Sequence, residues 1–156
     1  MVRDLERLAY ESALGALEKQ ERVLDELRAR TGVLLAASSV ATSFLGGRAV
    51  ATGGSIVVVT AMVAFGLLVA ASVVVLVPRR DAFTFSVSGP DVYEGLFAFR
   101  GDPNEIYRRP AYDLHRFWGA NDGQIQPLFA AFQIACAALV LEIALLLTSV
   151  SGTLVQ

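Results

Sequence analysis

The chain alternates between charged and uncharged blocks. Six Lys/Arg and seven Asp/Glu lie in residues 1–30, and the same numbers lie in residues 79–127. Between and after them come three largely apolar blocks, at residues 31–51, 55–77 and 128–150. About 20 helical residues are needed to cross the roughly 30 Å hydrocarbon core of a bilayer. The pattern therefore predicts an all-α membrane protein with three transmembrane helices.

The first apolar block is the shortest and the most polar of the three. Its uncharged part ends at Gly47, and it reaches the required length only if Arg48 extends its side chain toward the headgroups. The block contains two ladders with a spacing of four residues: Ser38, Thr42 and Gly46, and Ser39, Ser43 and Gly47. Small and hydroxylated faces let helices approach closely in lipid. Two interpretations are open: packing against the second span, or self-association and the lining of a pore.

The N-terminal block reads as an amphipathic helix over residues 3–30. A loose heptad seam runs along it and into the first span, interrupted by a glutamine: Tyr10, Ala13, Leu17, Gln20, Leu24, Leu27, Thr31 and Leu34. Glu26 and Arg30 are four residues apart and form a helix-supporting ion pair. No strong helix breaker separates this block from the next, so one helix is expected from about residue 3 to about residue 46.

The middle block, residues 79–127, carries nine of the aromatic side chains. Its alternating segment at 83–88 predicts a short strand or extended stretch. A turn and a short helix at 92–99 are expected to follow, and then a helix from Pro110 that leads toward the third span, with Pro127 kinking or starting that span. We therefore expect a small, mainly helical insert.

The distribution of basic residues predicts the orientation. Twelve of the 13 Lys and Arg residues lie in residues 1–30 and 79–127, and only Arg48 lies in the opposite set of flanks. Because basic loops stay in the cytoplasm, both blocks are expected there, with the tail at 151–156 outside the inner membrane. The highly charged N-terminus is unlike a cleavable signal peptide. The net charge of −2 without a basic run argues against a dedicated nucleic-acid binder.

Glu142 and Gln133 are the strongly polar side chains of the third span. An ionisable group near the centre of a span marks a functional site or a paired structural one. Glu142 is therefore either part of a cation or proton pathway, or a carboxyl group hydrogen-bonded to Thr60 or to hydroxyls of the first span. No catalytic motif and no metal-ligand spacing occurs around the sole histidine, His115, so neither an enzyme nor a metal site is expected.

The cytoplasmic blocks contain the parts of a nucleotide site. Guanidinium groups bind phosphate and aromatic faces stack on bases. The same residue types form an interfacial belt at headgroup level, so both interpretations are open. The candidate residues are Arg79, Arg80, Tyr107, Arg108, Arg109 and Trp118.

The layout resembles that of a known group of proteins. A cytoplasmic helix that leads into a small-residue-rich span at 27–47 and a membrane segment from Asp113 to Leu147 resemble the small transmembrane effectors of bacterial anti-phage signalling, the Pycsar transmembrane effectors and the related SLATT proteins. The chain is also similar to actinobacterial integral membrane proteins of similar length. The resemblance implies a cyclic nucleotide made by a partner cyclase, oligomerisation and disruption of the inner membrane.

These observations lead to one principal hypothesis and two alternatives. The principal hypothesis is a homo-oligomeric membrane effector that senses a cyclic nucleotide and compromises the bilayer. The first alternative is a non-enzymatic scaffold or subunit that binds a partner through its cytoplasmic helix. The second is a cation- or proton-conducting subunit that depends on Glu142.

Overall fold

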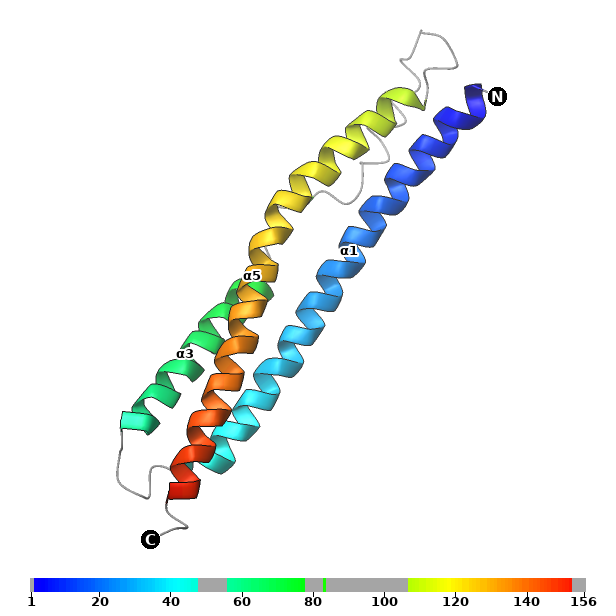
Figure 1. The fold of residues 1–156 in the computed structure, drawn as a ribbon. Helices are drawn as coiled ribbons and strands as arrows, with labels where there is room; N and C mark the ends of the chain where they lie inside the picture. Colours follow the sequence, from blue (N-terminus) through cyan, green and yellow to red (C-terminus); the bar gives the residue numbers. More distant parts are fainter. Residues whose placement is uncertain (1, 48–55, 78–82, 84–106, 153–156) are drawn as a thin grey trace. The chain divides into compact units, whose positions relative to one another are not determined.

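The computed structural model describes residues 2–47, 56–77, 83 and 107–152. Three α-helices make up nearly all of them (Figure 1): α1 (Val2–Ala41), α3 (Ile56–Leu76) and α5 (Arg108–Gly152). A π-helical segment, η1 (Thr42–Gly46), follows α1 directly. No strand occurs among the described residues, which confirms the all-α class. The expected strand beyond Phe83 and the short helix at 92–99 lie outside the described residues.

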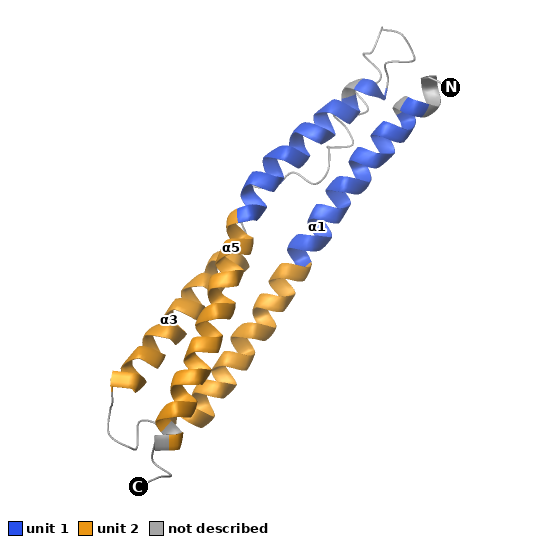
Figure 2. Ribbon diagram, in the orientation of Figure 1, with its two compact units in different colours: residues 1–25, 79–126 blue, residues 26–78, 127–156 orange. Residues whose placement is uncertain are grey.

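The chain forms two compact units (Figure 2). Unit 1 contains residues 1–25 and 79–126, and unit 2 contains residues 26–78 and 127–156. Helices α1 and α5 each contribute residues to both units. The division follows the change from charged to apolar sequence within a few residues, because segments of similar polarity pack together.

Unit 1 is a pair of helices with the same chain direction. The aromatic rings of Tyr10 and Tyr107 are 6.0 Å apart, and further along both helices the amide of Gln20 donates to the carbonyl of Trp118. The predicted seam faces inward, since Leu17 and Leu24 are buried. Gln20 interrupts the apolar seam; its amide nitrogen bonds to the partner helix, whereas its side-chain oxygen is buried without a hydrogen-bond partner among the described residues.

Unit 2 adds α3, which runs opposite to α5. Near the start of α3, Val58 and Ala61 form a buried cluster with Leu146. Near its end, Leu68 and Ala71 pack with the small residues of a second cluster, Ala135 and Ala138. Alanine at these contacts lets the two helices approach closely, as is common where lipid supplies no hydrophobic driving force.

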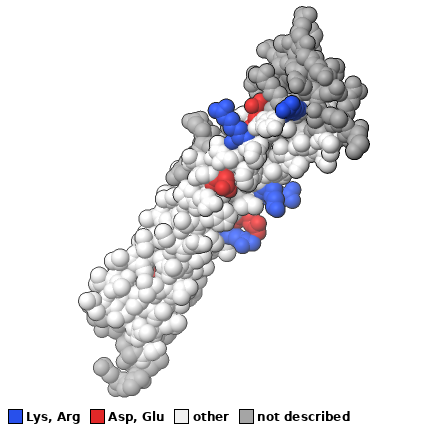
Figure 3. Space-filling view, turned by 45° about the horizontal axis from the view of Figure 1, so that its top comes forward, with Lys and Arg blue, Asp and Glu red and all other residues white. Residues whose placement is uncertain are grey.

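Helices α3 and α5 are long and apolar enough to cross a membrane. Only 33% and 22% of their most apolar stretches are buried within the chain, far less than expected for core helices of a soluble protein. Beyond residue 30, Glu142 is the one charged residue among those described in unit 2, and it is buried. Figure 3 accordingly shows a broad uncharged area of described surface.

The three predicted spans differ in how they appear in the structure. The second, 55–77, corresponds to α3, and the third, 128–150, lies within α5. Residues 31–47 are helical, but they are not among the candidate membrane spans, because this uncharged described stretch is shorter than the about 20 residues that a span needs and charged residues precede it. Residues 48–51 lie outside the described residues.

Pro127 lies inside α5 rather than at its start. Proline removes a backbone N–H donor and crowds the preceding turn, which is why a kink or a helix start was expected. The helix nevertheless continues through Pro127, from Arg108 to Gly152. The helix expected from Pro110 and the third span therefore form a single element.

Candidate functional site

Glu142 lies at the contact between α1 and α5 in unit 2. Its side chain is fully buried. The Ser38 hydroxyl donates to Oε2 over 2.8 Å, and the Thr42 hydroxyl donates to Oε1. The hydroxyls of α1 and η1, and not Thr60, are therefore the partners of this carboxyl group.

The helical repeat explains why these groups meet. Ser38 and Thr42 are four residues apart and thus share one face of the helix. The Thr42 hydroxyl oxygen also lies 2.9 Å from the Ser38 carbonyl oxygen, within hydrogen-bond distance. Threonine hydroxyls in helices commonly donate to the carbonyl four residues earlier. The π-helical segment begins at Thr42, the residue that contacts Glu142. Such segments often occur at functional positions in helices.

The second ladder of the first predicted span faces away from this contact. Ser39 and Ser43 are exposed, and each hydroxyl donates to a carbonyl of its own helix. A Cβ added at Gly47 would meet no atom within 4 Å, and one at Gly46 would meet only the Thr42 side chain. We call Ser39, Ser43 and Gly47 the outer ladder. In the described part of the chain all three residues are exposed.

Gln133, the other polar residue of the third predicted span, is exposed on α5. It lies nine residues before Glu142, so the helical repeat places it on a different face. The structure therefore does not bring the two polar residues of this span together.

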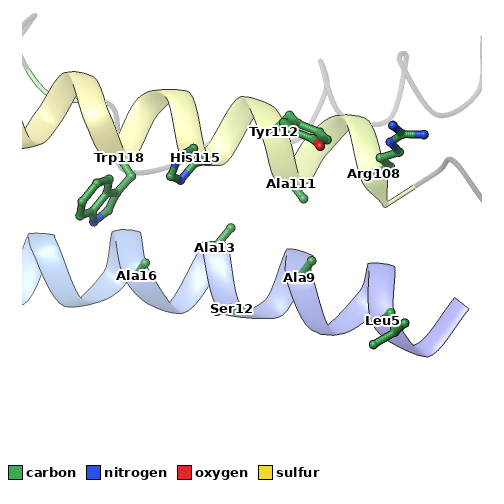
Figure 4. A pocket seen from close by; sticks show the side chains of 10 residues that line it. All are labelled: Leu5, Ala9, Ser12, Ala13, Ala16, Arg108, Ala111, Tyr112, His115 and Trp118. Carbon is green, nitrogen blue, oxygen red and sulfur yellow. The ribbon is translucent and has the colours of Figure 1, made fainter. Parts of the chain in front are cut away.

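A groove of about 750 Å³ lies between α1 and α5 in unit 1 (Figure 4). On α1 its wall consists, apart from Leu5, of small side chains at helical spacing, which leave room for the larger side chains opposite. Figure 4 shows the alanines of α1 pointing toward α5 and the indole of Trp118 extending toward α1. The groove is lined by Leu5, Ala9, Ser12, Ala13, Ala16, Arg108, Ala111, Tyr112, His115 and Trp118.

The α5 wall combines aromatic faces with a cation. The rings of His115 and Trp118 are stacked, with centroids 5.9 Å apart and an interplanar angle of 8°. One helical turn before His115, Tyr112 is two-thirds exposed, and Arg108 lies one further turn back. The wall therefore offers planar surfaces for stacking and a guanidinium group for an anion.

The structure brings together two of the six predicted ligand-binding residues. Arg108 and Trp118 line the groove, whereas the Tyr107 ring lies against Tyr10. Arg79 and Arg80 lie outside the described residues. Arg109 is part of α5, but its side chain is not described.

The sequence reasoning missed the α1 wall and the role of His115. Ala9, Ser12, Ala13 and Ala16 share one helix face, and small residues at spacings of three and four were the available signal. His115 and Trp118 are three residues apart on a helix, a spacing that also permits contact. The described residues contain no group of three or more His, Cys, Asp or Glu that could hold a metal ion.

Comparison with known proteins gives no match: no family model fits the chain, and no curated protein or solved structure is similar to it.

Proposed function

We propose that this chain is a homo-oligomeric effector of the inner membrane, triggered by a cyclic nucleotide, which acts by compromising the bilayer. The observation that carries the proposal is the groove of unit 1, with its stacked aromatic wall and Arg108. Its volume falls within the roughly 300–1,000 Å³ of small-molecule sites. The resemblance to the Pycsar and SLATT membrane effectors supplies the identity of the ligand class.

The lining of the groove suits a base joined to a phosphate. An aromatic face such as Trp118 stacks on any base, and stacking contributes about 1–3 kcal/mol per base. A guanidinium group such as Arg108 binds phosphate oxygens through a planar pair of N–H donors. We expect the base against the aromatic wall and the phosphate near Arg108.

Two features support coupling of ligand binding to the membrane. Both helices that line the groove, α1 and α5, also contribute residues to unit 2. The outer ladder presents small residues that are exposed in the described part of the chain. Small residues are typical of helix contacts between membrane subunits. In this proposal the ligand changes how copies pack along the outer ladder.

The proposal places three spans in the membrane. Helices α3 and α5 supply two of them, and the end of α1 with η1 supplies the first. All basic residues except Arg48 then lie on the cytoplasmic side, together with the N-terminus and residues 79–127. The tail at 151–156 lies outside.

Membrane potential in cells that produce the protein tests the function. Addition of purine and pyrimidine cyclic mononucleotides to proteoliposomes that carry an imposed membrane potential is expected to collapse the potential with at least one of them. Arg108→Gln and Trp118→Leu should prevent the collapse, whereas Arg116→Gln, a change in the same helix outside the groove, should not.

Binding is measured separately through the single tryptophan of the chain, Trp118. A base that stacks on its indole should quench the fluorescence in a saturable way. The proposal fails if the potential stays unchanged with every cyclic nucleotide while the protein is shown to be in the membrane. Co-purification of one stoichiometric protein partner without any higher homo-oligomer would favour the scaffold alternative.

A further inference from the structure

A second groove, of about 450 Å³, lies between α1 and α5 within unit 2. The groove extends along about two turns of α1. Its lining residues Arg30 and Ala37 are seven residues apart, which corresponds to about 10 Å along a helix. That length matches about eight methylene groups of an extended chain, counted at the usual carbon–carbon spacing. The groove is lined by Ala29, Arg30, Val33, Leu34, Ala37, Phe132 and Leu139.

The chemistry of this groove changes from one end to the other. Every lining residue except Arg30 is apolar, and Arg30 lies at the end that adjoins the charged sequence of residues 1–30. Its guanidinium bonds to Glu26 through one nitrogen, and the side chain is 66% exposed. An arginine has five N–H donors, so binding Glu26 leaves donors for a second anion.

The apolar end lies against a helix suited to the bilayer. Phe132 and Leu139 belong to the stretch of α5 that is long and apolar enough to cross a membrane. An apolar channel beside such a helix is filled by lipid chains unless protein covers it. A cation at its cytoplasmic end complements a phosphate, because basic side chains gather where anionic headgroups lie.

We propose that this groove binds an anionic phospholipid, with one acyl chain along Val33, Ala37 and Phe132 and the phosphate on Arg30. The inference depends on the proposed arrangement in which α5 and the end of α1 with η1 lie in the bilayer, and it is independent of the groove in unit 1. It assigns to the first membrane segment a lipid contact, in addition to its contact with Glu142.

The test uses the full chain in nanodiscs that contain equal amounts of phosphatidylglycerol and phosphatidylcholine. Lipids that remain bound after transfer to detergent are counted by native mass spectrometry. The wild-type chain is expected to retain phosphatidylglycerol in preference to phosphatidylcholine. Arg30→Gln should lower this preference about fivefold, the ratio that corresponds to about 1 kcal/mol for one basic side chain near an anionic surface.

Three further variants make the result specific. Ala37→Phe fills the groove and should remove the bound lipid, whereas Ala36→Phe, on an exposed neighbouring position outside the lining, should not. Arg30→Lys keeps the charge and should restore most of the preference. Circular dichroism checks that each variant stays helical.

Equal retention of both lipids by the wild-type chain would overturn the proposal, as would an unchanged preference in Arg30→Gln. If Ala37→Phe separates a dimer and leaves bound lipid unchanged, the groove is a contact between two copies and not a lipid site. Loss of cyclic-nucleotide response without loss of lipid would affect the effector proposal alone.

Discussion

At the scale of single residues, Glu142 accepts hydrogen bonds from two hydroxyls on another helix and has no exposed surface. A buried polar group that loses its partner costs about 1–3 kcal/mol, although interhelical hydrogen bonds in membranes average only about 0.6 kcal/mol. The packing of both carboxyl oxygens favours a structural link between α1 and α5 over a site that holds a mobile ion. The polarity of Glu142 was evident from the sequence. Whether its carboxyl group bonds to Thr60 or to hydroxyls of the first span was not.

Replacement of Glu142 distinguishes a structural link between α1 and α5 from a cation or proton pathway. Glu142→Ala should destabilise the protein by about 1–2 kcal/mol, because it leaves a void and removes the acceptor of the Ser38 hydroxyl, while the Thr42 hydroxyl can still donate to the Ser38 carbonyl. Glu142→Gln keeps the size and one acceptor oxygen, so its effect should be less than half as large. Thermal unfolding in detergent measures both, with Gln133→Ala, an exposed change on the same helix, as the control. Normal stability with abolished cation flux in Glu142→Gln would instead support the conducting subunit.

At the scale of elements, the small residues of the first predicted span divide into two faces with different surroundings. Ser38 and Thr42 face the third helix, whereas the outer ladder faces outward. Their four-residue spacing is identical, so periodicity alone could not assign either face. The helix expected over 3–46 is confirmed in extent, but the change to π-helix at Thr42, where the contact with Glu142 lies, has no signal in local propensity.

The outer ladder is expected to mediate contact between copies. Gly47→Leu should weaken the oligomer, because a large side chain keeps two helices from approaching closely. The isolated chain should tolerate the change, since a Cβ at Gly47 meets no atom within 4 Å. Cross-linking in membranes measures the oligomer, and Ala70→Leu on the exposed face of α3 is the matched control. An oligomer equally stable in both variants would rule out this face.

At the scale of the whole molecule, the number of spans determines where the N-terminus lies. With three spans the N-terminus is cytoplasmic and the tail is external. If only α3 and α5 cross, the N-terminus lies on the same side of the membrane as the tail. With residues 79–127 in the cytoplasm, the tail lies outside in both topologies. Only the position of the N-terminus therefore distinguishes three spans from two.

Fusion reporters at both ends are expected to give opposite results. A fluorescent protein joined before Met1 should fluoresce, because it folds in the cytoplasm, and alkaline phosphatase joined after Gln156 should be active, because it requires the outside. Phosphatase joined at Gly89 should be inactive and serves as the control. A dark N-terminal fusion with an active C-terminal one would indicate two spans.

The sequence by itself determined the helical class and the alternation of charged and apolar blocks, because both depend on local composition and periodicity. It also identified Glu142 as exceptional, since one carboxylate in an apolar stretch is visible without coordinates. Only the tertiary structure decided that Ser38 and Thr42 hold it, and that Arg108 and Trp118 share a groove with the alanines of α1. These contacts join residues about one hundred positions apart. Their pairing depends on the register between helices, which no local pattern specifies.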